Sequence, residues 1–330
     1  MPRNDPLIRR GAAFRARLFQ AVYPVVWRLR YSSPELQFAT RPITRPAKVT
    51  IPTRHGDLAA LVYSPAAGDI RWQKALGMLP PVHLITHGGA FIIRVPGQED
   101  NVARYLASEA GAFAVIPDYD TAPAVRFPVA EQEAYDAFRW VHENGAVMGW
   151  DGDRISAGGP GAGGKLALNV ALQAIDDGYP RPVAVCSEYG VADLSMPDEL
   201  RTSRKKRPVA GPGLMKLVRE TYFADADVTS PLASPARHPR LAELPPTLIL
   251  TAGHDTLRHE SNALARTIAA LGVPVTYREF PGADHGFTHT KPVVTARAAI
   301  RLLGAHLTRA YDTRNGSPLT ALSAQGNAQR

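Results

Sequence analysis

The chain has almost no cysteine and lacks a long apolar run. Its only cysteine among 330 residues is Cys186, which excludes an intramolecular disulfide, and no Cys/His spacing suggests a zinc site. This composition suits a reducing compartment, and we expect a cytoplasmic protein. The most apolar N-terminal stretch, residues 18–27, contains Gln20 and Pro24 and is too short to span a bilayer. No small-residue cleavage site follows it, which argues against a signal peptide.

Acidic residues are scarce near the N-terminus. Residues 1–54 carry eleven Lys/Arg and two acidic residues, a net charge of +9, whereas the other 276 residues sum to −1. A second basic cluster, RTSRKKR, occupies residues 201–207. No aromatic-interleaved basic motif typical of nucleic-acid binding accompanies these charges, so we expect no nucleic-acid partner. Two interpretations stay open: solvated surface, or a basic rim that makes weak contact with an anionic membrane or an acidic substrate.

The N-terminal segment nevertheless has a helical pattern. Apolar residues that recur at helical spacing predict one apolar side of a basic amphipathic helix: Phe14, Leu18, Val22, Val25 and Leu29. An interruption of about fifty residues, whose central part is residues 195–228, is typical of a lid or cap insert. The polar residues 312–330 lack periodicity and predict a disordered tail.

Strand and helix patterns alternate through residues 46–311. Apolar, strand-like runs are separated by helical patterns and lie at residues 82–89, 113–119, 154–159, 183–190, 247–255 and 275–280. Two more strand-like runs precede them. The alternation predicts a single α/β domain with about eight mostly parallel strands and helices on both faces of the sheet.

A glycine-rich stretch, ISAGGPGAGGKLALN at residues 155–169, permits two interpretations. Gly159 to Lys165 has the spacing of a phosphate-binding loop, but Leu166 follows where a Ser or Thr would bind Mg²⁺. The same stretch fits the G-x-S-x-G turn of a hydrolase, with Gly161 in the position of the nucleophilic serine. The local strand–loop–helix pattern does not distinguish the two.

Residues elsewhere in the chain favour the hydrolase turn. HGGAF at residues 87–91 follows a strand, and its glycines allow backbone amides to point at one oxygen atom. Asp255 also follows a strand, and His285 comes thirty residues later. The chain order of turn, acid and histidine is that of α/β-hydrolases. A nucleotide-binding protein is therefore the remote alternative.

With these motifs the sequence resembles the hormone-sensitive-lipase-like branch of the α/β-hydrolases. HGGAF corresponds to the family's HGGGF, and DYDTAP corresponds to DYRLAP. SPLASP and HGF match the family's motifs as well. The resemblance therefore runs from about residue 82 to residue 287. It implies that Asp255 orients His285 and that an oxyanion hole is formed by the amides of Gly88, Gly89 and Ala162. It also implies that residues 1–45 and the insert at residues 195–228 form a cap over the acyl pocket. The implied substrate is a small acyl ester, without a cofactor or metal. We expect a monomer or homodimer.

Two residues depart from the family pattern. Gly161 has no side chain to act as a nucleophile, and Pro160 replaces the usual acidic residue before it. Neither Ser156, inside a strand, nor Cys186, expected to be buried, obviously replaces the missing hydroxyl. Three hypotheses follow: chemistry assisted by His285, either direct hydrolysis or a non-hydrolytic proton transfer; a non-catalytic binding protein; or an esterase inactivated by replacement of Ser with Gly.

Overall fold

A computed structural model describes residues 6–30 and 33–312, so the tail predicted after residue 312 lies outside the described residues. One eight-stranded sheet has the order β1-β2-β4-β3-β5-β6-β7-β8. β1 and β2 pair antiparallel, as do β2 and β4, and the strands from β4 to β8 are parallel. This arrangement confirms the predicted α/β fold with a mostly parallel sheet.

The strands follow the apolar runs of the sequence. Their bounds are β1 Ala47–Thr53, β2 Gly56–Tyr63, β3 Val82–Ile85, β4 Phe113–Pro117, β5 Ile155–Pro160, β6 Val185–Glu188, β7 Thr247–Ala252 and β8 Val275–Phe280. Every residue of the five strands from β3 to β7 is buried, whereas no residue of the edge strand β8 is. Central strands buried on both faces read as continuous apolar runs, which is why the sequence pattern located them.

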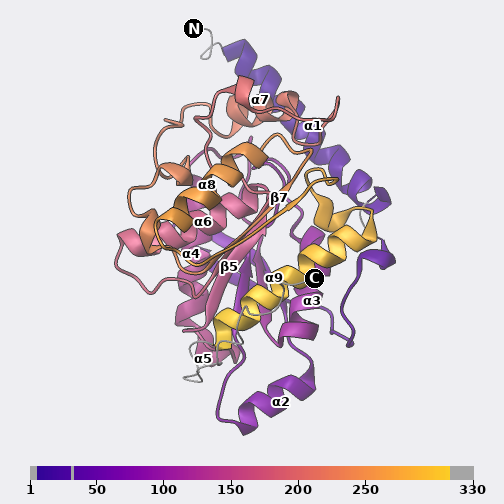
Figure 1. Cartoon of the computed structure of the whole chain (residues 1–330), viewed down its shortest axis with the longest axis vertical. Coiled ribbons are helices and arrows are strands. Elements are labelled where there is room, and N and C mark those ends of the chain that lie inside the picture. The colour runs from indigo at the N-terminus through magenta and orange to yellow at the C-terminus, as the bar shows by residue number, and fades with distance from the viewer. Residues whose placement is uncertain (1–5, 31–32, 313–330) are drawn as a thin grey trace, which may run out of the picture.

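Helices cover both faces of the sheet. Their bounds are α1 Pro6–Arg30, α2 Ala67–Ala75, α3 Asp100–Tyr105, α4 Val129–Glu143, α5 Gly145–Met148, α6 Ala162–Asp176, α7 Pro212–Thr221, α8 Arg258–Ala270 and α9 Val293–Asp312. Figure 1 shows α4, α6 and α8 on one side of the sheet and α3 and α9 on the other. The parallel connections between strands require such crossover helices.

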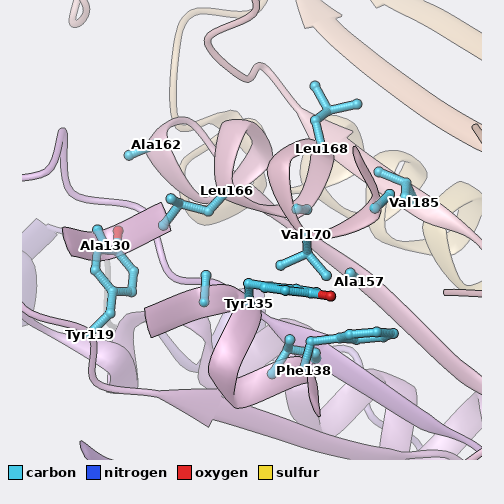
Figure 2. Packing of buried hydrophobic residues seen from close by; sticks show 14 of the residues in the cluster. Tyr119, Ala130, Tyr135, Phe138, Ala157, Ala162, Leu166, Leu168, Val170 and Val185 are labelled. Carbon is cyan, nitrogen blue, oxygen red and sulfur yellow. The ribbon is translucent and has the colours of Figure 1, made fainter. Parts of the chain in front are cut away.

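The two layers of helices enclose separate apolar cores. On one face α4 and α6 lie side by side on the sheet, and Leu166 and Val170 of α6 meet Tyr135 and Phe138 of α4 in a single buried cluster (Figure 2). On the other face Ile300, Leu303 and Leu307 of α9 pack with residues of α3. These cores fix the carboxyl ends of the parallel strands, where the residues of the predicted site lie.

The two predicted cap segments contact each other. α1 lies beside α7, which belongs to the predicted insert, at one end of the molecule (Figure 1), and Arg15 forms an ion pair of 2.8 Å with Glu220. Of the helices in residues 6–30 and 33–312, not one combines the length and the apolar character needed to cross a bilayer.

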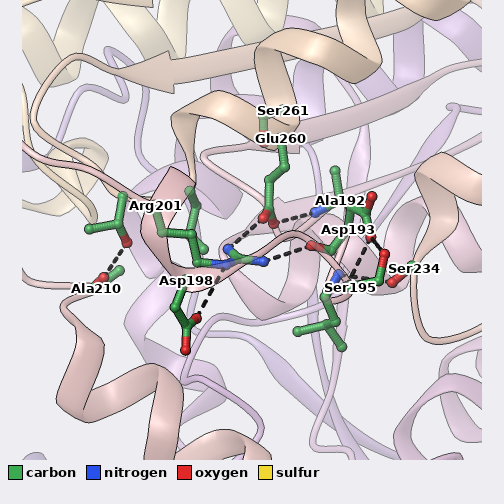
Figure 3. Close-up of polar contacts among 12 residues, drawn as sticks. Ala192, Asp193, Ser195, Asp198, Arg201, Ala210, Ser234, Glu260 and Ser261 are labelled. Atoms are coloured by element: carbon green, nitrogen blue, oxygen red, sulfur yellow. Dashed lines mark hydrogen bonds and ion pairs between the residues drawn. The ribbon is translucent and has the colours of Figure 1, made fainter. Parts of the chain in front are cut away.

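The basic run at residues 201–207 is not a uniform surface rim. Arg201 is buried, where its guanidinium forms an ion pair with Glu260 and donates to the carbonyl of Asp193 at 2.6 Å (Figure 3). Burial raises the pKa of Glu260 to about 7, and Arg201 opposes that rise. The expectation of an exposed rim is therefore wrong for Arg201, which ties the insert to α8. The other four Lys/Arg of the run are exposed.

Candidate active site

Gly161 lies at a sharp turn between β5 and α6. Its backbone angles are φ 55° and ψ −114°, in a region that side chains of L-residues rarely occupy, and its N–H donates to the carbonyl of Glu188 at 2.9 Å. A Cβ atom added to Gly161 would lie 3.0 Å from Nε2 of His285. The turn thus has the strained strand-to-helix geometry expected of a nucleophile position, and the imidazole faces it.

Asp255 and His285 form the hydrogen bond that the sequence predicts. Nδ1 of His285 lies 2.7 Å from Oδ2 of Asp255, and the carboxyl group is buried just after β7. Asp255 also accepts the amide of Leu257 at 3.0 Å, which fixes the orientation of the carboxylate. Burial lowers the pKa of His285, but the charges of Asp255 and Asp284 outweigh it, so the pKa lies above its ordinary value.

The backbone amides beside Gly161 differ in part from the prediction. The N–H of Gly88, a predicted oxyanion-hole amide, donates to Oε1 of Glu99 at 3.1 Å, so in this structure it already has an acceptor. Among the described residues, the amides of Gly89 and Ala90 have no acceptor, and both residues line a cavity beside Gly161. Ala162 is the first residue of α6, where an amide lacks an acceptor within the helix.

The backbone of residues 89–91 is held in an unusual conformation. Gly89 has φ +130°, and a Cβ there would lie 2.6 Å from the carbonyl oxygen of Ile93, so only glycine fits. Ala90 and Phe91 both have φ of 56°, in the left-handed region. The strained residues Gly89 and Ala90 line the same cavity as Gly161.

Lys165 does not belong to a phosphate-binding loop. Its Nζ is fully buried and lies 2.6 Å from Oε1 of Glu131, 2.8 Å from Oδ1 of Asn169 and 2.8 Å from the carbonyl of Leu232. A phosphate loop needs this amine at the terminal phosphates of a nucleotide. The nucleotide-binding alternative is therefore wrong, and Lys165 is a structural cation of α6 that is buried against Glu131 of α4.

The space beside Gly161 has two compartments. One cavity of about 120 Å³ is lined by the inner side of α1 and by residues 88–90 and 160–161. A smaller, mainly apolar one of about 30 Å³ is lined by Ala162, Leu194, Met215 and Val218, among others. His285 lines both compartments, as do Ala90 and Leu214. The imidazole therefore stands where the two meet.

Comparison with known proteins agrees with this geometry. A family model described as an α/β hydrolase fold matches residues 83–289. The chain belongs to the α/β-hydrolase family. It is 34% identical over 227 residues to an acetyl-hydrolase of Streptomyces hygroscopicus (68% of this chain, 74% of the relative) and 34% identical over 220 residues to the esterase LipI of Mycobacterium tuberculosis (66% and 68%). A hyperthermophilic esterase from the archaeon Pyrobaculum calidifontis superposes with a TM-score of 0.79 at 29% identity, covering 92% of this chain and 98% of the archaeal one.

These relatives confirm the resemblance to hormone-sensitive-lipase-like esterases. The protein is a carboxylesterase-like α/β hydrolase. The two other side chains considered as substitutes do not line either compartment. Ser156 is buried between His83 and Tyr311, and burial raises the pKa of the Cys186 thiol well above its ordinary value.

Sequence reasoning missed a buried ionisable cluster next to the cavity of this α/β hydrolase. Oε2 of Glu99 lies 3.0 Å from Nε2 of His289, and both residues line the larger compartment. Glu188 is buried nearby, and burial together with the charge of Glu99 raises its pKa to about 8, against an opposing effect of His289. A glutamate within an apolar strand, as Glu188 is in VAVCSEYG, was the one signal that could have revealed the cluster.

Proposed function

We propose that the protein hydrolyses small acyl esters with a water molecule that His285 activates directly, without an acyl-enzyme. The observation that carries the proposal is the position of the imidazole. Nε2 of His285 faces the site where residue 161 has no side chain, at 3.0 Å from a Cβ placed there, while Asp255 holds Nδ1. A general base aimed at a space next to unpaired amides can deprotonate water instead of serine.

The reaction needs no group beyond those of the site. His285 Nε2 accepts a proton from water, and the water oxygen bonds to the ester carbonyl carbon. The amides of Gly89, Ala90 and Ala162 donate to the resulting oxyanion. The C–O bond to the alcohol then breaks, His285 returns its proton to the leaving oxygen, and a carboxylic acid and an alcohol are released. A non-hydrolytic proton transfer would use the same base and amides.

The size of the smaller compartment supports a short acyl chain. A cavity that holds one water needs roughly 10–15 Å³, so about 30 Å³ suits a group of the size of an acetyl methyl. Its mainly apolar lining favours an alkyl group over a charged one. The names of the relatives, an acetyl-hydrolase and esterases, support the same substrate class.

Removal of His285 tests the proposal. The purified protein should hydrolyse p-nitrophenyl acetate slowly and without a burst, and His285→Ala should lower the rate by roughly 10²-fold or more because the base is lost. His55→Ala is the matched control, since His55 is exposed and contacts Gln132 far from the cavity. An unchanged rate in His285→Ala would place the activity elsewhere. Binding of the ester without any turnover would instead identify a non-catalytic binding protein.

The pH dependence should follow the ionisation of His285. Only the neutral imidazole accepts a proton, so the rate should fall as the pH drops through the pKa of His285, which Asp255 and Asp284 raise. Asp255→Asn removes one of these charges, so the acidic limb of the pH–rate profile should move to lower pH while the plateau falls. An acidic limb that stays at the same pH in Asp255→Asn would contradict the role of His285 as the base.

A further inference from the structure

The outer face of α1 is apolar and uncovered among the described residues. Phe14, Leu18, Val22 and Val25 have exposed fractions of 68%, 54%, 49% and 59%. At 3.6 residues per turn they fall on one side of the helix, within an arc of about 80°. Isolated exposed apolar residues are common, but four in one stripe mark an interaction surface.

This stripe is not a core face turned outward, because α1 packs through its other side. Ala12 and Ala16 are fully buried, and Phe19, Tyr23 and Trp27 line the larger compartment beside Gly161. The sequence predicted the stripe as the apolar side of the helix but not the buried inner side; the fifth predicted member of the stripe, Leu29, has a side chain outside the described part. The helix therefore has two apolar sides, and among the described residues only the inner side packs against the rest of the chain.

Arginines border the stripe. Arg10, Arg17 and Arg28 are exposed and lie within about 20° of one another around the helix axis, on one edge of the stripe. None of the three has an ion-pair partner within the described residues. Arg15 lies on the opposite edge, where it pairs with Glu220 of α7. An apolar stripe with cations along its edge is complementary to a lipid surface, in which anionic headgroups lie above apolar acyl chains.

We propose that the outer face of α1 binds the surface of an anionic lipid bilayer, with the helix lying in the plane of the membrane. The apolar stripe enters the boundary between headgroups and acyl chains, and the row of Arg10, Arg17 and Arg28 contacts lipid phosphates. A second copy of the chain fits this face less well. Pairing two such helices would bring two arginine rows together in chains that each carry a net charge of +8.

Docking through α1 would place the cavity near the membrane. The inner side of the same helix forms one wall of the larger compartment, and the exposed Val209 lines that compartment after four exposed cations at residues 204–207. Acyl esters that partition into the bilayer would then be concentrated beside Gly161. The docking itself does not depend on the proposed hydrolysis.

Co-sedimentation of the full chain with vesicles tests the surface. We expect binding to phosphatidylcholine vesicles containing phosphatidylglycerol, weak binding to phosphatidylcholine alone, and loss of the difference as salt is added. Leu18→Glu/Val22→Glu should reduce binding to the level of neutral vesicles. Val294→Glu is the matched control, because Val294 is 73% exposed on α9 and lies outside the stripe, so it should bind as the unmodified protein does.

The arginine row is tested separately. Each of Arg10→Gln, Arg17→Gln and Arg28→Gln should weaken binding to anionic vesicles by about fivefold. Circular dichroism should show an unchanged fold, since all the substituted residues are exposed. Equal binding to neutral and anionic vesicles, or equal loss in the Val294→Glu control, would overturn the proposal. A concentration-dependent dimer that Leu18→Glu/Val22→Glu abolishes, without vesicle binding, would assign the face to a second copy.

Discussion

Gly161→Ser should produce rapid ester turnover, a burst of product and covalent labelling by a serine-directed phosphonate. The unmodified protein should show neither burst nor label at residue 161, because no hydroxyl oxygen is present there to attack. Loss of the nucleophile in a serine protease costs about 10⁶-fold in turnover, so restoration could gain several orders of magnitude. Mass spectrometry of the labelled peptide and stopped-flow kinetics with p-nitrophenyl acetate measure both effects.

Three features of the turn set the size of this gain. A Cβ at residue 161 would lie 3.0 Å from Nε2 and 3.3 Å from Cε1 of His285, so the imidazole must withdraw by a few tenths of an ångström. The φ of 55° is also unfavourable for a side chain and costs about 1–3 kcal/mol of folding free energy. Pro160 stiffens the backbone immediately before the new hydroxyl, and a tilt away from His285 would reduce the gain.

Gly161→Ala is the control that separates strain from chemistry. It adds the same Cβ against His285 and the same backbone penalty, but no hydroxyl, so it should lower stability as much as serine does without labelling. Gly161→Ser/His285→Ala should lose the recovered turnover, because the serine then has no base. Failure of a folded Gly161→Ser to label, with the Asp255–His285 bond intact, would show that the turn does not present residue 161 to the cavity.

The parts of the site that depend on strand ends were predictable from the sequence. Gly161, Asp255 and His285 each follow a strand pattern, and parallel strands bring their carboxyl ends to one edge of the sheet. The hydrogen bond between Asp255 and His285 is present as predicted. Local pattern and chain order therefore located the dyad and the turn.

Contacts between distant side chains were not predictable in this way. The amide of Gly88 is paired because the carboxylate of Glu99, eleven residues later, turns back to it, and no periodicity encodes that turn. Arg201 looked like one member of a surface cluster, yet it is buried against Glu260 of α8. In α1 the periodicity found an apolar stripe correctly but not which side of the helix faces the core, since both sides carry apolar residues.

Breaking the buried pair of Lys165 and Glu131 should strongly destabilise the α4–α6 layer. Both side chains are fully buried, and Glu131 also accepts the hydroxyl of Tyr222 at 2.6 Å. Burial lowers the pKa of Lys165, and Glu131 opposes that effect. Lys165→Met would leave the carboxylate of Glu131 without its cation in an apolar layer, so we expect a loss of about 3–5 kcal/mol in the free energy of unfolding.

Urea denaturation at neutral pH measures this loss, and two further variants identify its cause. Lys165→Met/Glu131→Gln should recover much of the stability, because no uncompensated charge stays buried. Arg139→Ala, which removes the cation of an exposed pair with Glu143 on α4, should cost no more than about 1 kcal/mol. If Lys165→Met costs as little as Arg139→Ala, water must reach Glu131, and the layer beneath the candidate active site is less closed than the packing of α6 indicates.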